Sequence, residues 1–197
     1  MLTQVATVKA RLGLEEADVK DDALLEQLVK LVSARFDKEA NRTFGYNADA
    51  SEEFSGSEME IRPACIPIAD VSFFELKTNE ADGWENAVAD YLIRRATVIS
   101  LSTPLGTDKQ QGRVNYSGGY VLPGGTAVAE VPALPDDIEQ SCIDQVVYLF
   151  QNKDRLGIAS MSGQGGSLTK DLQSVVTPAT LLPAVQQVLK KYERWVN

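Results

Sequence analysis

The stretch "NYSGGYVLPGG" (Asn115–Gly125) stands where the sequence changes from one periodicity to another. Before it, from about residue 51 to 120, short runs of β-branched and aromatic residues alternate with Gly, Pro, Asn and Asp, which is typical of antiparallel strands. After it, "LPDDIEQSCIDQVVYLFQNK" (residues 134–153) carries apolar residues at helical spacing. The stretch therefore predicts a turn that returns a β-module to a helical body, and an α+β chain.

Five runs, "EEFSG", "MEIRP", "VSFFELK", "ADYLIRRATVISL" and "GRVNYSGGYV", predict the strands of a small antiparallel β-module over residues 45–122. We expect Gly118 and Gly119 to form the tight turn of a hairpin, because glycine tolerates the positive φ angles that such turns require. Tyr116 and Tyr120 would pack their rings on the helices and keep their hydroxyls in water. A structural role is favoured here over a ligand-binding loop.

The segments on either side of the β-module have helical periodicity. Residues 1–44 predict two N-terminal helices, the first stopped by Gly13, and residues 123–155 predict a core helix capped by Asp136 or Asp137. At 197 residues the chain has the length of one domain with a real core. The expected fold is a mainly α-helical bundle with a small antiparallel β-module inserted between the helices, as a single domain over residues 1–197.

Residues 156–197 divide into two parts. Residues 156–176 are rich in Gly and Ser and predict a mobile segment; "GQGGSLTK" within it does not match the order of residues in a phosphate-binding loop. A last helix follows, with Leu181, Leu182, Val185, Val188, Leu189, Tyr192 and Trp195 along one stripe. This stripe either completes the bundle or docks into a groove of a neighbouring subunit.

The charge is unevenly spread. The net charge is −9, and residues 45–90 hold eleven acidic residues against two basic ones. Proteins that grip nucleic acid usually display a basic stripe, so tight, direct DNA binding is disfavoured. No stretch approaches the roughly 18 to 20 apolar residues of a membrane span, and no signal peptide is visible at the N-terminus. We expect a soluble cytoplasmic protein without a membrane partner.

The residues that most often carry chemistry are scarce. The chain has no histidine, which removes the commonest general base and metal ligand, so an enzyme is disfavoured and no cofactor, metal or catalytic residue is expected. Cys65 and Cys142 are expected to be buried apolar thiols. The alternative is a metal-dependent nuclease, in which Glu58 and Glu60, two apart on a strand, would bind a divalent cation with Asp70 and Glu75. Alternating carboxylates are more often the solvated face of a sheet.

The order of these parts resembles the head–tail connector (adaptor) proteins of tailed bacteriophages and prophages. The resemblance covers nearly the whole chain and is most specific where Tyr116–Pro123 runs into Leu134–Ile158. It implies a structural, non-catalytic virion protein located in the neck, and in the host cytoplasm before assembly. Such proteins form a homo-oligomeric ring, commonly of twelve copies, that joins the capsid portal protein to the tail-completion or stopper protein after DNA packaging. The ring would form from monomers.

The resemblance also implies roles for particular residues. It assigns the C-terminal part to assembly contacts with the portal or an adjacent subunit, through Leu156, Ile158, Leu181, Leu182, Val185, Leu189, Tyr192 and Trp195. DNA would pass through the ring without specific binding. Acidic residues facing the channel would repel its phosphates, and the candidates are Glu58, Glu60, Glu80 and Asp82. A third hypothesis is a chaperone or inhibitor that mimics DNA and binds a basic protein.

Overall fold

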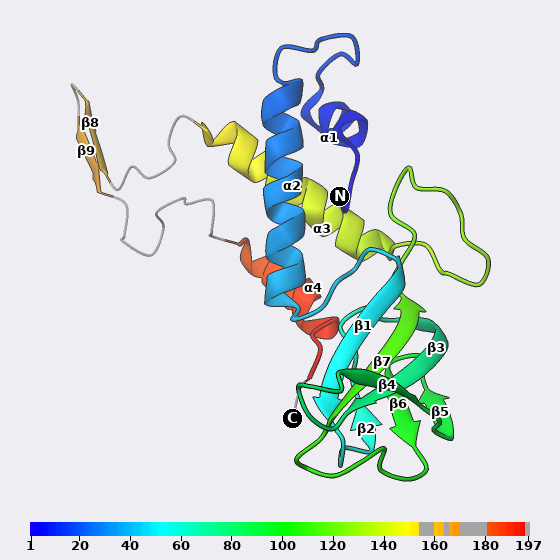
Figure 1. Ribbon diagram of the computed structural model, residues 1–197. Coiled ribbons are helices and arrows are strands. Elements are labelled where there is room, and N and C mark those ends of the chain that lie inside the picture. The colour runs from blue at the N-terminus through cyan, green and yellow to red at the C-terminus, as the bar shows by residue number, and fades with distance from the viewer. Residues whose placement is uncertain (154–159, 164–165, 170–180, 196–197) are drawn as a thin grey trace. The chain divides into compact units, whose positions relative to one another are not determined.

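The computed structural model describes residues 1–153, 160–163, 166–169 and 181–195. The chain divides into two compact units (Figure 1). The helical unit comprises Met1–Phe36 and Pro135–Lys191, and the β unit comprises Asp37–Leu134 and Tyr192–Asn197. The β unit is thus inserted between two parts of the helical unit, and the last residues of the chain belong to it.

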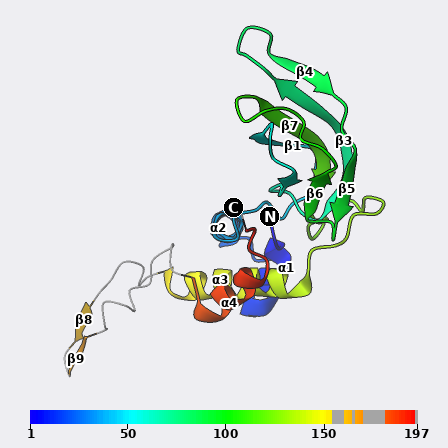
Figure 2. The ribbon, with the colours of Figure 1, turned by 90° about the horizontal axis from the view of Figure 1, so that it is seen from below.

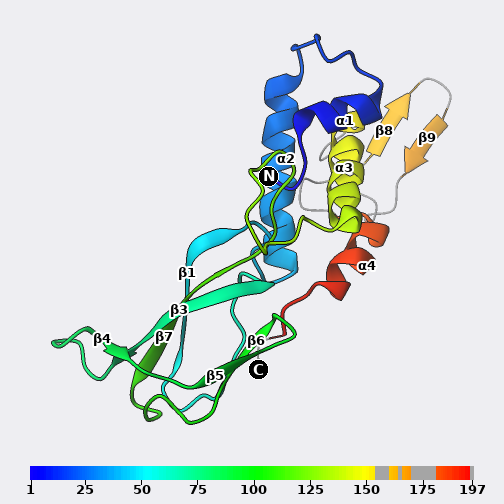
Figure 3. The same ribbon diagram turned by 90° about the vertical axis from the view of Figure 1, so that its right-hand side faces the viewer.

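The helical unit contains α1 (Val5–Leu12), most of α2 (Asp22–Glu39), α3 (Asp136–Gln151) and α4 (Pro183–Lys191). Gly13 ends α1 in the left-handed conformation, with a φ of 71°, and its N–H donates to the carbonyl oxygen of Ala10. Both α1 and α4 pack against α3, and Figure 3 shows the first of these contacts. The helices predicted around residues 3–12, after Asp22, after Asp136 and near the C-terminus are therefore confirmed.

The core of the helical unit consists of the apolar stripes that the helical spacing indicated. Burying one such side chain stabilises the fold by about 1.5–3 kcal/mol. The buried residues are Val8 of α1, Leu25, Val29, Val32 and Phe36 of α2, Ile138, Cys142, Ile143, Val146 and Leu149 of α3, and Val185 and Leu189 of α4.

One buried lysine holds the connection between α1 and α2. Lys9 is only 4% exposed. Its ammonium group lies 2.9 Å from the carboxylate of Asp22 and donates to the carbonyl oxygens of Glu16 and Asp18, at 2.7 and 2.6 Å. Because a buried cation is stable only when its donors are satisfied, these contacts fix the path of the loop.

The β unit contains two antiparallel sheets. The four-stranded sheet has the order β1 (Asn47–Ser55), β7 (Gln111–Gly118), β3 (Ile68–Lys77) and β4 (Trp84–Ala87). The three-stranded sheet has the order β2 (Glu60–Ile61), β6 (Val98–Leu101) and β5 (Tyr91–Arg94). In Figure 2, β3 and β7 curve strongly along their length. Their pairing shifts register twice, between Ile68 and Asp70 and between Val71 and Phe73, and such irregularities increase strand bending.

The two sheets share one core. Alternate residues point into it where the pairing is regular, as in β7, whereas the buried residues of β3 follow at intervals of three across its register shifts. The buried cluster consists of Ala50, Phe54, Ile61, Cys65, Ile66, Ile68, Val71, Phe74, Ile99, Leu101, Val114 and Tyr116. The β unit therefore has a hydrophobic core of its own.

The expectation of a mainly helical bundle with a small β-module is wrong. The β unit spans Asp37–Leu134, contains seven strands in two sheets and has its own core, so the chain is a β-rich α+β protein. The five predicted runs do form strands, but their pairing across long sequence separations is not visible in local periodicity. β4, with the sequence "WENA", was missed because it is short and lacks β-branched residues.

The Gly- and Ser-rich segment contains a further strand pair. β8 (Ser160–Gly163) and β9 (Gly166–Thr169) form an antiparallel hairpin. The other residues of the segment that we predicted to be mobile, 156–159, 164–165 and 170–176, lie outside the described residues.

Candidate assembly surfaces

The apolar stripe of α4 is used inside the helical unit. Leu181, Val185 and Leu189 are 6%, 3% and 3% exposed. Leu182 is half-buried, and its backbone N–H donates to the side-chain oxygen of Gln145 on α3, at 2.9 Å. These four residues, predicted as assembly contacts, therefore already have partners within the chain. Leu156 and Ile158, also predicted, lie outside the described residues.

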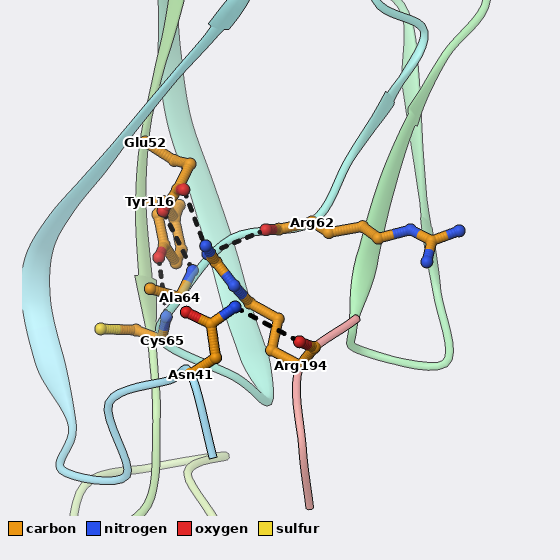
Figure 4. Close-up of polar contacts among 7 residues, drawn as sticks. All are labelled: Asn41, Glu52, Arg62, Ala64, Cys65, Tyr116 and Arg194. Carbon is orange, nitrogen blue, oxygen red and sulfur yellow. Dashed lines mark hydrogen bonds and ion pairs between the residues drawn. The ribbon is translucent and has the colours of Figure 1, made fainter. Parts of the chain in front are cut away.

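The segment after α4 is bound by the β unit through Arg194 (Figure 4). The Arg194 guanidinium lies 3.0 Å from the Glu52 carboxylate and donates to the carbonyl oxygen of Arg62, also at 3.0 Å. Its backbone N–H donates to the carbonyl oxygen of Ala40, at 2.8 Å. Arg194 and Glu52 are 14% and 23% exposed in their side chains, so this ion pair is better shielded from solvent than an ordinary surface pair.

The aromatic residues on either side of Arg194 differ in exposure. Tyr192 is half-buried, with its ring edge-on to Phe44 at a centroid distance of 6.3 Å. Trp195 is 72% exposed, and its carbonyl oxygen accepts from Arg62 at 3.3 Å. Among the predicted assembly residues that the structure describes, Trp195 is the one with a largely exposed side chain.

The residues predicted to form a hairpin turn lie at the end of β7 and just beyond it. Gly118 is the last residue of β7 and pairs with both β1 and β3. Gly119 has a φ of 104°, and the Tyr120 N–H then donates to the carbonyl oxygen of Phe44, at 2.8 Å. The chain thus continues along residues 44–46 instead of reversing.

Glycine is required at this point because the backbones approach closely. A Cβ on Gly118 would lie 2.4 Å from the carbonyl oxygen of Cys65, and one on Gly119 would lie 2.5 Å from that of Gly45. Tyr116 is 1% exposed, inside the β core, and its hydroxyl accepts the Cys65 N–H at 3.0 Å (Figure 4).

Burial of Tyr116 and of the two cysteines disfavours their charged forms. Desolvation raises the pKa of the Tyr116 hydroxyl and of the Cys65 thiol, and raises the pKa of Cys142 to about 12. Both cysteines are free and buried, as the sequence indicated.

The four acidic residues proposed to face a channel are all exposed, but two of them have basic partners. Glu60 lies 3.1 Å from Arg94 and 3.8 Å from Arg62, and Glu80 lies 2.6 Å from Lys77. Asp82 accepts from the side chain of Asn79, and no partner is found for the Glu58 side chain among the described residues. These pairs reduce the negative field at two of the four positions.

The carboxylates considered for a metal site serve other contacts. Glu75 pairs with Arg113 at 2.6 Å and accepts from Asn115 at 2.9 Å. Within the described part of the chain, no three or more His, Cys, Asp or Glu residues are grouped so that they could hold a metal ion.

The outer face of the four-stranded sheet carries an ordered cluster that the sequence did not indicate. The Arg113 guanidinium lies between the Glu75 carboxylate and the ring of Trp84, whose centroid is 4.2 Å away. Phe73 is 47% exposed on the same face, in register with Asn115. Tryptophan, arginine and phenylalanine are enriched in protein–protein interfaces, so this face is suited to binding another protein. Strand alternation in "VSFFELK", "WENA" and "GRVNYSG" could have revealed it, had the pairing of these three strands been known.

An open groove lies where the strands of this sheet end. It has a volume of about 680 Å³ and is lined by residues of both charges, among them Glu53, Lys77, Glu80, Asp108 and Lys109. Its polar, mixed-charge lining is unlike the mainly apolar pockets that bind small molecules.

Comparison with known proteins identifies the fold. A scan against protein-family models and a search of curated proteins give no match. Among solved structures, the chain matches a chain of the neck of an empty GTA particle computed with C6 symmetry, with a TM-score of 0.59 and 13% sequence identity. The match covers 100% of this chain and 91% of the other. The two chains therefore share a fold over the whole of this chain and most of the other. None of the described helices is long and apolar enough to cross a membrane.

Proposed function

We propose that this protein is a structural, non-catalytic component of a phage or prophage neck, where it forms a ring that joins the capsid portal to the tail after DNA packaging. One observation carries the proposal: the likeness in fold to a chain of a particle neck extends over the whole of this chain. The order of segments that resembles head–tail connectors, in particular Tyr116–Pro123 running into Leu134–Ile158, supports it independently of the structure.

The ring consists of identical copies, with twelve as the expected number, and assembles from monomers on the portal. Its partners are the portal protein on one side and a tail-completion or stopper protein on the other. The groove at the strand ends, the outer face of the four-stranded sheet and the exposed Trp195 are surfaces that the described part of the chain offers to other copies or partners.

The charge of the β unit suits a channel wall. This unit has sixteen acidic residues against nine basic ones, whereas the helical unit has twelve against ten. A surface of net negative charge repels phosphates, so DNA passes without binding.

The proposal is tested by deleting the gene from the genome that carries it and imaging the particles. We expect DNA-filled heads and free tails that do not join, and restoration of tailed particles by the gene supplied in trans. Normal numbers of tailed particles from the deletion would contradict the proposal.

A second measurement tests the finer statement. The native mass of the protein, alone and with its portal protein, should change from that of a monomer to that of a portal-bound ring. A persistent monomer in the presence of portal would contradict the ring.

A further inference from the structure

The β unit has two outer faces that point away from its shared core. Phe74, Val114 and Tyr116 point inward from the four-stranded sheet, and Ile99 and Leu101 point inward from the three-stranded sheet. Because side chains alternate along a strand, the intervening residues form the two outer faces. We call them the acidic face and the basic face, for the charges described next.

The acidic face belongs to the four-stranded sheet. Asp49, Glu53 and Asp70 are exposed, and none of their side chains has an ion-pair partner among the described residues. The register places Glu53 directly opposite Arg113, whose charge is already neutralised by Glu75. The face therefore has an excess of negative charge.

Exposed apolar groups lie within the acidic face. Phe73 is 47% exposed, and Val88, which directly follows β4, is fully exposed. Phe74 pairs with Ala87, so Phe73 and Val88 occupy the next position along the two strands, on the outer side.

The basic face belongs to the three-stranded sheet. Glu60, its single carboxylate in these strands, lies between the guanidinium groups of Arg94 and Arg62, at 3.1 and 3.8 Å. Arg95 follows in the turn, exposed and without an ion-pair partner among the described residues. Leu92 is 63% exposed on this face, opposite Ser100. The end of the face where β5 turns into β6 thus has excess positive charge, with an exposed apolar side chain beside it, while the exposed Glu58 and Asp90 lie beyond the opposite end.

We infer that the acidic face of one copy binds the basic face of the next copy. The two faces are complementary in charge, and each has an exposed apolar group that such a contact would bury. They are different surfaces of the same unit, so the contact is heterologous and repeats from copy to copy, as a ring requires. The inference rests on the proposed ring and specifies which surfaces build it.

Two charge-reversal variants test the contact. The first, Glu53→Lys with Asp70→Lys, makes the acidic face basic. The second, Arg94→Glu with Arg95→Asp, makes the basic face acidic, and Asp suits the positive φ of 52° at position 95. Lys38→Glu, at an exposed position in the last turn of α2, is the control.

Each variant alone should weaken self-association at least about tenfold in sedimentation experiments at low salt with the portal protein present, because like charges then meet. An equal mixture of the two should assemble as the wild type does, since every acidic face then meets a basic one in an alternating order. A merely destabilised variant would not be rescued by mixing. The control should assemble normally.

Three results would overturn the inference: wild-type protein that forms no ring in the presence of the portal protein, variants that assemble like the wild type, or a mixture that remains dissociated. The proposed function is judged separately, by tail attachment in the gene deletion. If the wild-type gene restores tailed particles and each variant does so equally well, the neck role stands and this contact is wrong.

Discussion

The helical unit and the β unit obtain their cores in different ways. In the helical unit, the stripe of each helix is set within a short stretch, as in α3, where Ile138, Cys142 and Val146 follow at intervals of four. In the β unit, Phe74 pairs with Val114, forty residues away, and with Ala87 on the other side. The core of the helical unit can be predicted from one segment at a time, whereas the core of the β unit depends on which strands pair.

The largest expected effect comes from breaking one core at a time. Phe74→Ala should destabilise the β unit by about 3–5 kcal/mol, and Leu149→Ala should destabilise the helical unit by about 2–5 kcal/mol, since both side chains are buried. Trp84 and Trp195, the two tryptophans of the chain, both belong to the β unit. Tryptophan fluorescence therefore follows the β unit, while circular dichroism at 222 nm mainly follows the helices.

If the two units unfold separately, Phe74→Ala should shift the fluorescence transition more than the dichroism transition, and Leu149→Ala the reverse. Equal shifts of both transitions in both variants would show that the units unfold together.

The next effect concerns glycines of the β unit. Gly119 and Gly83 both have positive φ angles, of 104° and 73°, but a Cβ meets backbone only at Gly119. Gly83→Ala should reduce stability by about 1–2 kcal/mol from backbone strain alone. Gly119→Ala should reduce it by about 2–4 kcal/mol, since crowding is added to strain. Urea titration measures the free energy of unfolding of both variants. Equal losses would mean that the backbone around Gly119 shifts and removes the crowding.

A smaller effect separates a shielded ion pair from an exposed one. Glu52→Ala removes the carboxylate that pairs with the Arg194 guanidinium and accepts from the Ala64 N–H, so a loss of about 1–3 kcal/mol is expected. Glu80, the partner of Lys77, has a side chain that is 90% exposed, and Glu80→Ala should change stability by less than about 0.5 kcal/mol. Denaturant unfolding compares the stabilities of the two variants. If Glu52→Ala lost as little stability as the control Glu80→Ala, the contact with Arg194 would not be important for stability.

The smallest effect is a pH dependence of the helical unit. Cys142 has a pKa raised to about 12 from 9.0, so the unfolded thiol ionises first as pH rises. The protonated Cys142 thiol therefore makes its full contribution to the free energy of unfolding below pH 9. This contribution is lost between pH 9 and 12, by at most about 1.4 kcal/mol per pH unit. Cys142→Ala should flatten the decline in the dichroism transition above pH 9. An unchanged slope would assign the decline to other groups.

Local periodicity predicted the helices and most strands, but not the division into two units. The stripe of "LLEQLVKLV" and the capping acids Asp136 and Asp137 contain what a helix needs. In contrast, the curvature of β3 depends on register shifts against β7, which no single segment reveals. The contact of the α4 segment within the chain could not be predicted from one segment either, because Gln145, which accepts the Leu182 N–H, lies on another helix. The Trp84–Arg113–Glu75 cluster was missed since its members come from three strands.

The path of the chain has a consequence for recombination. The β unit takes its residues from two separate stretches, and Arg194 comes from the second, after α4. A transplant of residues 37–134 into a foreign host protein would leave Glu52 and the carbonyl oxygens of Ala40 and Arg62 without this guanidinium and its N–H. Evolutionary exchange of the insertion between homologous chains would therefore preserve these contacts only if it carried the end of the gene along with its middle.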